Sequence, residues 1–143
     1  MGLKLNLRAN ERLVINGALL TALKPTSLLI NNQVSMLLER HIMRPEHANT
    51  PARRVYFAIQ CAYIADAAER PPYLEQAETF IKDFEGATES PKVRALLTDM
   101  RRNLEQRAYY DALKLCRDLI SYEEVVLNLP SLETSPSTVP SAG

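Results

Sequence analysis

The sequence predicts an α+β fold, in which a small N-terminal antiparallel β lobe is followed by a lobe resembling a four-helix bundle. Apolar and polar residues alternate over residues 3–8, as in a half-buried strand. The pair Asn16-Gly17 separates two short apolar runs and favours a hairpin turn. Beyond Thr50-Pro51, apolar residues recur at spacings of three and four, which is typical of amphipathic helices. We expect a basic β lobe at residues 1–44, a helical lobe at 45–128 and a disordered Ser/Thr/Pro-rich tail at 129–143.

The strands of the β lobe are predicted from short apolar runs that turn residues separate. The turn signals are Asn16-Gly17, Pro25 and the pair Asn31-Asn32. They place strands at residues 3–8, 12–15, 18–23, 27–30 and 34–38, arranged as a meander or a small barrel-like sheet. A sheet of about 40 residues is marginal by itself, so it should pack on the helices or on a second copy of itself.

The helices are predicted from their start signals and their apolar faces. Thr50-Pro51 and Ser90-Pro91 each combine a capping hydroxyl with a proline, which lacks the N–H that the first helical position leaves unpaired. We expect helices at residues 51–65, 73–85, 91–106 and 108–127, with Gly86 ending the second. Arg53 and Arg54 fall in the first turn of the first helix, where the helix dipole favours acids. They are either solvated or paired charges, or cations with a function.

The distribution of charge gives one electrostatic indication. Seventeen bases balance seventeen acids over the 143 residues, so no global basic field attracts nucleic acid. Residues 1–44, however, hold six bases against two acids, which leaves the β lobe at +4 and the remainder at −4. The N-terminal lobe is therefore the basic part of the chain.

No residue pattern in the chain indicates catalysis. His41 and His47 lack a carboxylate or cysteine at metal-ligand spacing, and Cys61 and Cys116 fall in apolar stripes as expected of reduced core thiols. The four glycines form no phosphate loop. We predict a protein that is not an enzyme and needs no metal or cofactor. Without a signal-peptide pattern or a membrane-length apolar run, a cytoplasmic location without membrane contact is expected.

The remaining hypothesis is that the protein is a binding module. Exposed arginines can clamp phosphates or stack on unpaired bases, and the basic lobe and the first helix supply them. Tyr109-Tyr110, beside Arg101, Arg102 and Arg107, either stack on a base or pack at the end of the bundle. The candidate RNA-binding residues are Arg8, Arg12, Arg40, Arg44, Arg53 and Arg54.

Three stretches of the sequence resemble the FlbT family of flagellin-synthesis regulators. They are LKLNLRANERLVINGA at the N-terminus, the LLERHIM run, and TPARRVYFAIQCAYI, and the resemblance covers residues 1–127. It implies a cytoplasmic regulator of flagellum biogenesis that binds the 5′ untranslated region of flagellin mRNA, represses translation and promotes mRNA decay. Some members of the family act positively instead.

The first third is also similar to the carbon storage regulators, small β-stranded proteins that bind mRNA. The matching positions are Arg8 and the triplet Glu39-Arg40-His41, whose order is reversed, so only the two arginines are carried over. Those proteins are dimers, and we expect a homodimer through the β lobe. The alternative function is a protein-interaction or chaperone-like module that docks flagellar proteins and affects mRNA only indirectly.

Overall fold

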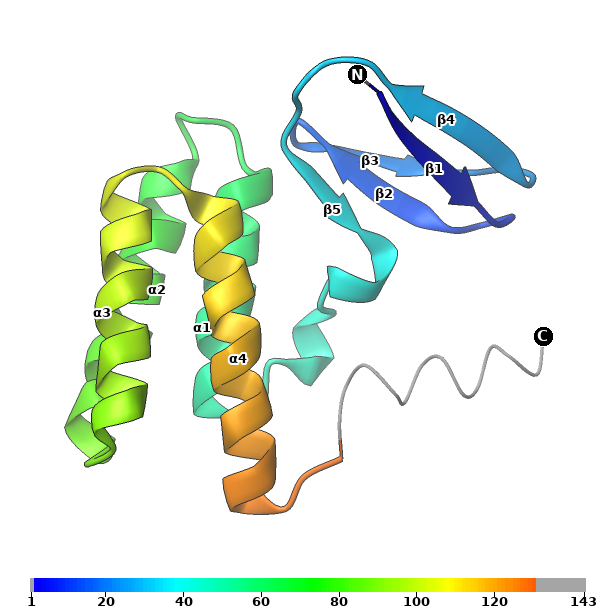
Figure 1. Cartoon of the computed structure of the whole chain (residues 1–143). Coiled ribbons are helices and arrows are strands. Elements are labelled where there is room, and N and C mark those ends of the chain that lie inside the picture. Colours follow the sequence, from blue (N-terminus) through cyan, green and yellow to red (C-terminus); the bar gives the residue numbers. More distant parts are fainter. Residues whose placement is uncertain (1, 131–143) are drawn as a thin grey trace.

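Five short strands precede four helices along the chain, so the predicted α+β class is confirmed (Figure 1). The computed structural model describes residues 2–130, and all of the predicted tail except Leu129 and Pro130 lies outside them. Two 3-10 turns, η1 (Glu39–His41) and η2 (Pro45–His47), link the strands to the helices. The strands are β1 (Leu3–Leu7), β2 (Arg12–Ile15), β3 (Ala18–Thr21), β4 (Thr26–Ile30) and β5 (Met36–Leu38). The helices are α1 (Pro51–Ile64), α2 (Arg70–Ala87), α3 (Pro91–Glu105) and α4 (Tyr109–Leu127).

The strands form two small sheets, not the single meander or barrel-like sheet that was expected. β1 pairs with β4, and a second sheet has the order β3-β2-β5, with all pairs antiparallel. The meander was wrong because β5 pairs beside β2, where Val14 lies opposite Leu37. Both side chains are almost fully buried and belong to the main hydrophobic core. Burial of this pair therefore explains why β5 lies beside β2.

The hairpin predicted at Asn16-Gly17 is present. Both residues have positive φ, 50° and 84°, as a two-residue hairpin turn requires. A Cβ at Gly17 would lie 2.8 Å from the carbonyl oxygen of Ile64. Glycine is needed here twice, for its backbone conformation and for the close approach of the hairpin to the end of α1.

Both hydroxyl-proline helix starts are confirmed. Thr50 Oγ1 accepts a hydrogen bond from the N–H of Arg53, and Ser90 Oγ accepts one from the N–H of Val93. Helix α2 begins at Arg70, three residues before the predicted start, because Pro71 and Pro72 fit a first turn that needs no N–H. It also continues one residue past Gly86, which was expected to end it.

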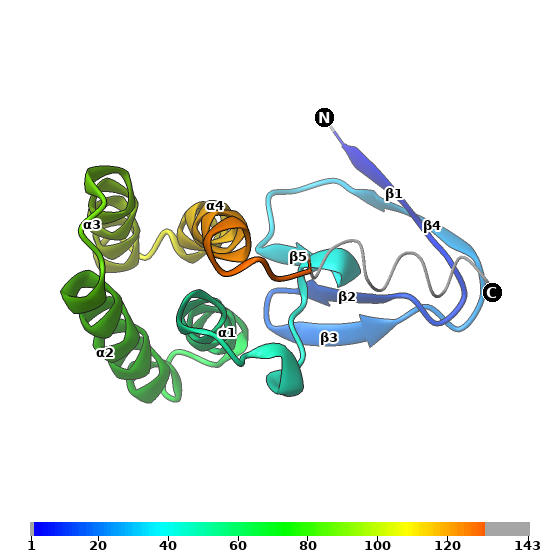
Figure 2. The same ribbon diagram turned by 90° about the horizontal axis from the view of Figure 1, so that it is seen from below.

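Helices α1 and α4 lie between the β lobe and the outer pair, α2 and α3 (Figures 1 and 2). The buried core runs through the four helices and takes Val14 and Leu37 from the β lobe. Burial of this apolar surface is the main force that holds the lobes together. The junction between the β lobe and the inner helices is therefore the part of the fold that positions the candidate residues.

Candidate nucleic-acid interface

Helix α1 forms hydrogen bonds with the backbone of residues 36–43, the segment that carries Arg40 and precedes Arg44. The side-chain amide of Gln60 accepts from the N–H of Met43 at 2.7 Å and donates to the Met43 carbonyl at 2.9 Å. The hydroxyl of Tyr56 donates to the carbonyl of His41 at 2.5 Å, and that of Tyr63 to the carbonyl of Met36 at 3.1 Å. Three side chains of one helix thus fix the path of residues 36–43.

The structure brings three of the candidate arginines to one end of the β lobe. Arg8 follows β1, with its side chain 87% exposed and its Nε 4.0 Å from Glu11. Arg12 opens β2, and its Nε lies 3.6 Å from Glu39, the neighbour of Arg40 in η1. Arg40 is exposed. We name Arg8, Arg12 and Arg40 the basic end of the β lobe.

Next to this basic end, His41 is held neutral. Its pKa falls from 6.5 to about 4, first because burial disfavours the charged ring and then because Arg117 and Arg40 lie nearby. Among the described residues, three buried side-chain nitrogens have no hydrogen-bond partner, namely His41 Nδ1, Arg117 Nη1 and Arg53 Nε. Arg40 and Arg44 are therefore the cations that this segment offers to solvent at neutral pH, and Arg44 too is exposed.

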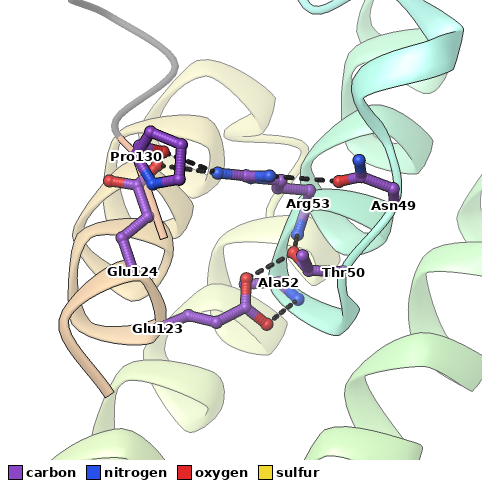
Figure 3. Close-up of polar contacts among 7 residues, drawn as sticks. All are labelled: Asn49, Thr50, Ala52, Arg53, Glu123, Glu124 and Pro130. Carbon is purple, nitrogen blue, oxygen red and sulfur yellow. Dashed lines mark hydrogen bonds and ion pairs between the residues drawn. The ribbon is translucent and has the colours of Figure 1, made fainter. Parts of the chain in front are cut away.

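Arg53 lies in a buried polar network at the start of α1, away from solvent (Figure 3). Its side chain is 6% exposed and donates to Asn49 at 3.1 Å, to Glu124 at 3.2 Å and to the carbonyl of Pro130 at 3.2 Å. Arg54, one residue on, is exposed. The two consecutive arginines therefore have different environments, and only Arg54 is available to a ligand.

The acid that the start of α1 lacks in sequence comes from α4 (Figure 3). Glu123, 5% exposed, accepts the N–H of Ala52 at 2.9 Å and the hydroxyl of Thr50. A carboxylate at a helix N-terminus satisfies unpaired N–H groups and interacts favourably with the helix dipole. The network thus explains how α1 tolerates Arg53 in its first turn.

A second feature of the junction lies where α4 begins. A cleft of about 620 Å³ opens between residues 33–38 of the β lobe and residues 107–111, and we name it the tyrosine cleft. Tyr63, Tyr109 and Tyr110 line it together with Arg70 and Arg107. The sequence indicated the tyrosine pair and Arg107 as a group. Tyr63, known from the sequence only as part of the FlbT-like stretch, and Arg70 join them through the packing of α1 and α2. Arg101, which is near the tyrosine pair in sequence, instead forms ion pairs with Glu78 and Glu85.

An apolar groove lies at the other end of the bundle. Its volume is about 580 Å³, and it is bounded by the start of α1, the end of α2, the start of α3 and the end of α4. Phe80, Phe84, Tyr122 and Val126 supply apolar walls, and Arg54 lies at its border. Val126 and Leu127 leave more than half of their surface exposed. This groove is suited to an apolar partner rather than to an anionic one.

Residues 2–130 offer few groups for metal binding or thiol chemistry. Within residues 2–130, no three His, Cys, Asp or Glu side chains gather as metal ligands would. Cys116 is buried and Cys61 half-buried, both are free thiols, and burial raises the pKa of each. No helix among these residues has the length and apolarity that crossing a membrane requires.

Comparison with known proteins places the chain among flagellar proteins. Residues 3–127 match the family described as "Flagellar protein FlbT". The flagellum biosynthesis repressor protein FlbT of Caulobacter vibrioides strain CB 15 is 34% identical over 125 residues, which cover 87% of this chain and 88% of that protein. The chain belongs to the FlbT family.

Two further relatives match over similar lengths. The probable flagellum biosynthesis repressor protein FlbT of Caulobacter sp. strain K31 is 35% identical, over 87% of this chain and 95% of the relative. The protein of the same name from Allorhizobium ampelinum is 32% identical, over 96% and 90%. No solved structure matches the chain.

Proposed function

We propose that this chain is a cytoplasmic repressor of flagellin synthesis that binds the 5′ untranslated region of flagellin mRNA, blocks translation and promotes mRNA decay. Membership of the FlbT family, whose relatives are named flagellum biosynthesis repressors, supports a regulatory role in flagellum biogenesis. The observation that carries RNA binding is the basic end of the β lobe, formed by Arg8, Arg12 and Arg40, with exposed Arg44 four residues after Arg40 in the chain. Arginine binds phosphates with two donors and stacks on unpaired bases.

We expect Arg8→Gln and Arg40→Gln to weaken binding of a flagellin leader RNA, because each removes an exposed cation. For single-stranded RNA, each lost phosphate contact should reduce the slope of log affinity against log salt by about 0.7. Fluorescence anisotropy between 50 and 200 mM salt measures both quantities. The matched control is Arg102→Gln, an exposed arginine on α3, whose Nη1 is 3.0 Å from Asp99. Leader binding that is undetectable or independent of salt contradicts the proposal.

A second candidate function rests on the apolar groove at the far end of the bundle. Its walls of Phe80, Phe84 and Val126 are suited to an apolar segment of a flagellar protein, with only an indirect effect on mRNA. Capture of a flagellar protein that persists after nuclease treatment supports this function. Loss of every partner after nuclease treatment would argue against it and for RNA as the bridge.

We also propose a homodimer through the β lobe. β1 and β4 pack chiefly on each other, and a two-stranded ribbon is marginally stable in water by itself. Leu3 and Leu29 of this ribbon are 50% and 59% exposed, and Leu19 of the edge strand β3 is 57% exposed. A second copy would cover these leucines and pair the free strand edges.

The homodimer is tested by mass. Light scattering at micromolar concentration should give the mass of two chains, and Leu29→Lys should give that of one. Because Leu29 is largely exposed, the substitution should leave the fold of the single chain unchanged. Circular dichroism checks this point. A stable wild-type monomer would contradict the proposal.

A further inference from the structure

The tyrosine cleft is large enough to admit a small ligand. Its volume of about 620 Å³ lies in the range usual for small-molecule pockets. One wall is the β-lobe segment with Gln33 and Ser35, both exposed, and the other is the start of α4. The cleft is thus open to solvent and combines aromatic rings with polar side chains.

The aromatic rings of the cleft are fixed in place. Tyr63 donates to the Met36 carbonyl at 3.1 Å, and its ring centroid lies 6.3 Å from that of Tyr110. Arg70 donates to two carbonyls at the end of α1 and lays its guanidinium 5.1 Å from the centroid of the Tyr109 ring. Tyr109 is 9% exposed, whereas Tyr110 is 37% exposed. Tyr110 therefore offers solvent a ring that its neighbours hold in position.

Two cations lie over this ring. Lys114 Nζ and Arg117 Cζ are each 5.9 Å from the centroid of the Tyr110 ring. Arg107 is exposed, has a left-handed φ of 62° and makes no side-chain hydrogen bond or ion pair with any residue from 2 to 130. Asp111 is the acid that lines the cleft. Proteins hold stacked bases and their flanking phosphates with aromatic rings and nearby cations in combination.

We propose that the tyrosine cleft binds an unpaired nucleobase of RNA, stacked on Tyr110, with Arg107 and Lys114 at the adjoining phosphates. Gln33 is exposed and also lines the cleft, and a side-chain amide can hydrogen-bond to a base edge. This inference rests on the proposed RNA-binding function and adds to it a second contact, separate from the basic end of the β lobe. Binding at both places would require the leader to cross the junction between the lobes.

The test measures binding of fluorescein-labelled decameric oligoadenylate and of a flagellin leader RNA. Tyr110→Ala should weaken the binding of both by about tenfold or more, since a stacked base is lost. Its salt slope should stay unchanged, because no charge is removed, and Tyr110→Phe should bind like the wild type. Arg107→Gly, which also suits the left-handed φ, should weaken binding and reduce the slope by about 0.7.

The matched control is Tyr122→Ala. Tyr122 lies on the same helix, far from the cleft, and is also 37% exposed. Its truncation should leave RNA binding unchanged. Because the chain has six tyrosines and no tryptophan, quenching of tyrosine emission by unlabelled oligoadenylate gives a second readout, which Tyr110→Ala should reduce.

The outcomes separate this inference from the proposed function. If the wild type binds the leader and neither Tyr110→Ala nor Arg107→Gly weakens that binding, the base site is overturned and the proposed function stands. Oligoadenylate binding that requires Tyr110, without any preference for the leader, supports the site and overturns the proposed function. If Tyr110→Ala no longer captures a flagellar protein but binds RNA as the wild type does, the cleft is a protein-binding site and the base site is overturned.

Discussion

Glu123→Ala should lower the free energy of unfolding by about 2–4 kcal/mol, because two hydrogen-bond donors would be buried without a partner. These are the N–H of Ala52 and the hydroxyl of Thr50, which lie in the network of Figure 3. The substitution also removes the acid from the start of α1 and leaves Arg53 in its first turn. Urea unfolding followed by circular dichroism measures the change.

The control for Glu123→Ala is Asp118→Ala on the same helix. Asp118 is exposed, and loss of an exposed carboxylate should change stability by no more than about 0.5 kcal/mol. Glu123→Gln should fall between the two, since the amide keeps one acceptor oxygen but no charge. Equal stabilities of Glu123→Ala and Asp118→Ala would show that the network does not hold α4 to the start of α1.

Gln60→Met should destabilise the chain by about 2–4 kcal/mol, since the N–H and the carbonyl of Met43 would both lose their partner. Methionine approximates the volume of glutamine, so the change removes hydrogen bonds with little loss of packing. Amide hydrogen exchange provides a local readout. Exchange at Met43 should accelerate more than exchange in α3, which does not touch this segment.

Gln76→Met on α2 is the matched control for Gln60→Met. Gln76 is exposed, whereas Gln60 is 4% exposed, so the same chemical change at residue 76 should leave stability nearly unaltered. Unchanged exchange at Met43 in Gln60→Met would contradict the role assigned to the amide.

The features that sequence predicted correctly depend on residues adjacent in the chain. Asn16-Gly17 sets its own backbone conformation, and Thr50-Pro51 supplies a cap and a first turn within three residues. The α+β class follows from such local patterns, because each element's periodicity is visible within it. Boundaries were less accurate where two signals compete, as at Pro71-Pro72, which fit a loop end and a helix start equally well.

The features that sequence missed depend on distant pairing. β5 lies beside β2 because Leu37 and Val14 are buried together, which no local pattern reveals. Glu123 and Ala52 are 71 residues apart, so the acid at the start of α1 was not visible in its own helix. Arg70 seemed to belong to a linker, yet it holds Tyr109 at the tyrosine cleft. Tertiary context decides such roles. Arg53 is buried and Arg54 is exposed, so neighbours in sequence can differ completely in their access to solvent.

The contacts of α1 with residues 36–43 have a consequence for how the sequence of this segment can change. Tyr56, Gln60 and Tyr63 all bind main-chain atoms of this segment, namely those of His41, Met43 and Met36. Main-chain atoms are the same in every amino acid other than proline. Mutations can therefore replace the outward-facing side chains of this segment without disturbing its path. The surface of this segment can therefore vary in sequence while its backbone keeps the same position on α1.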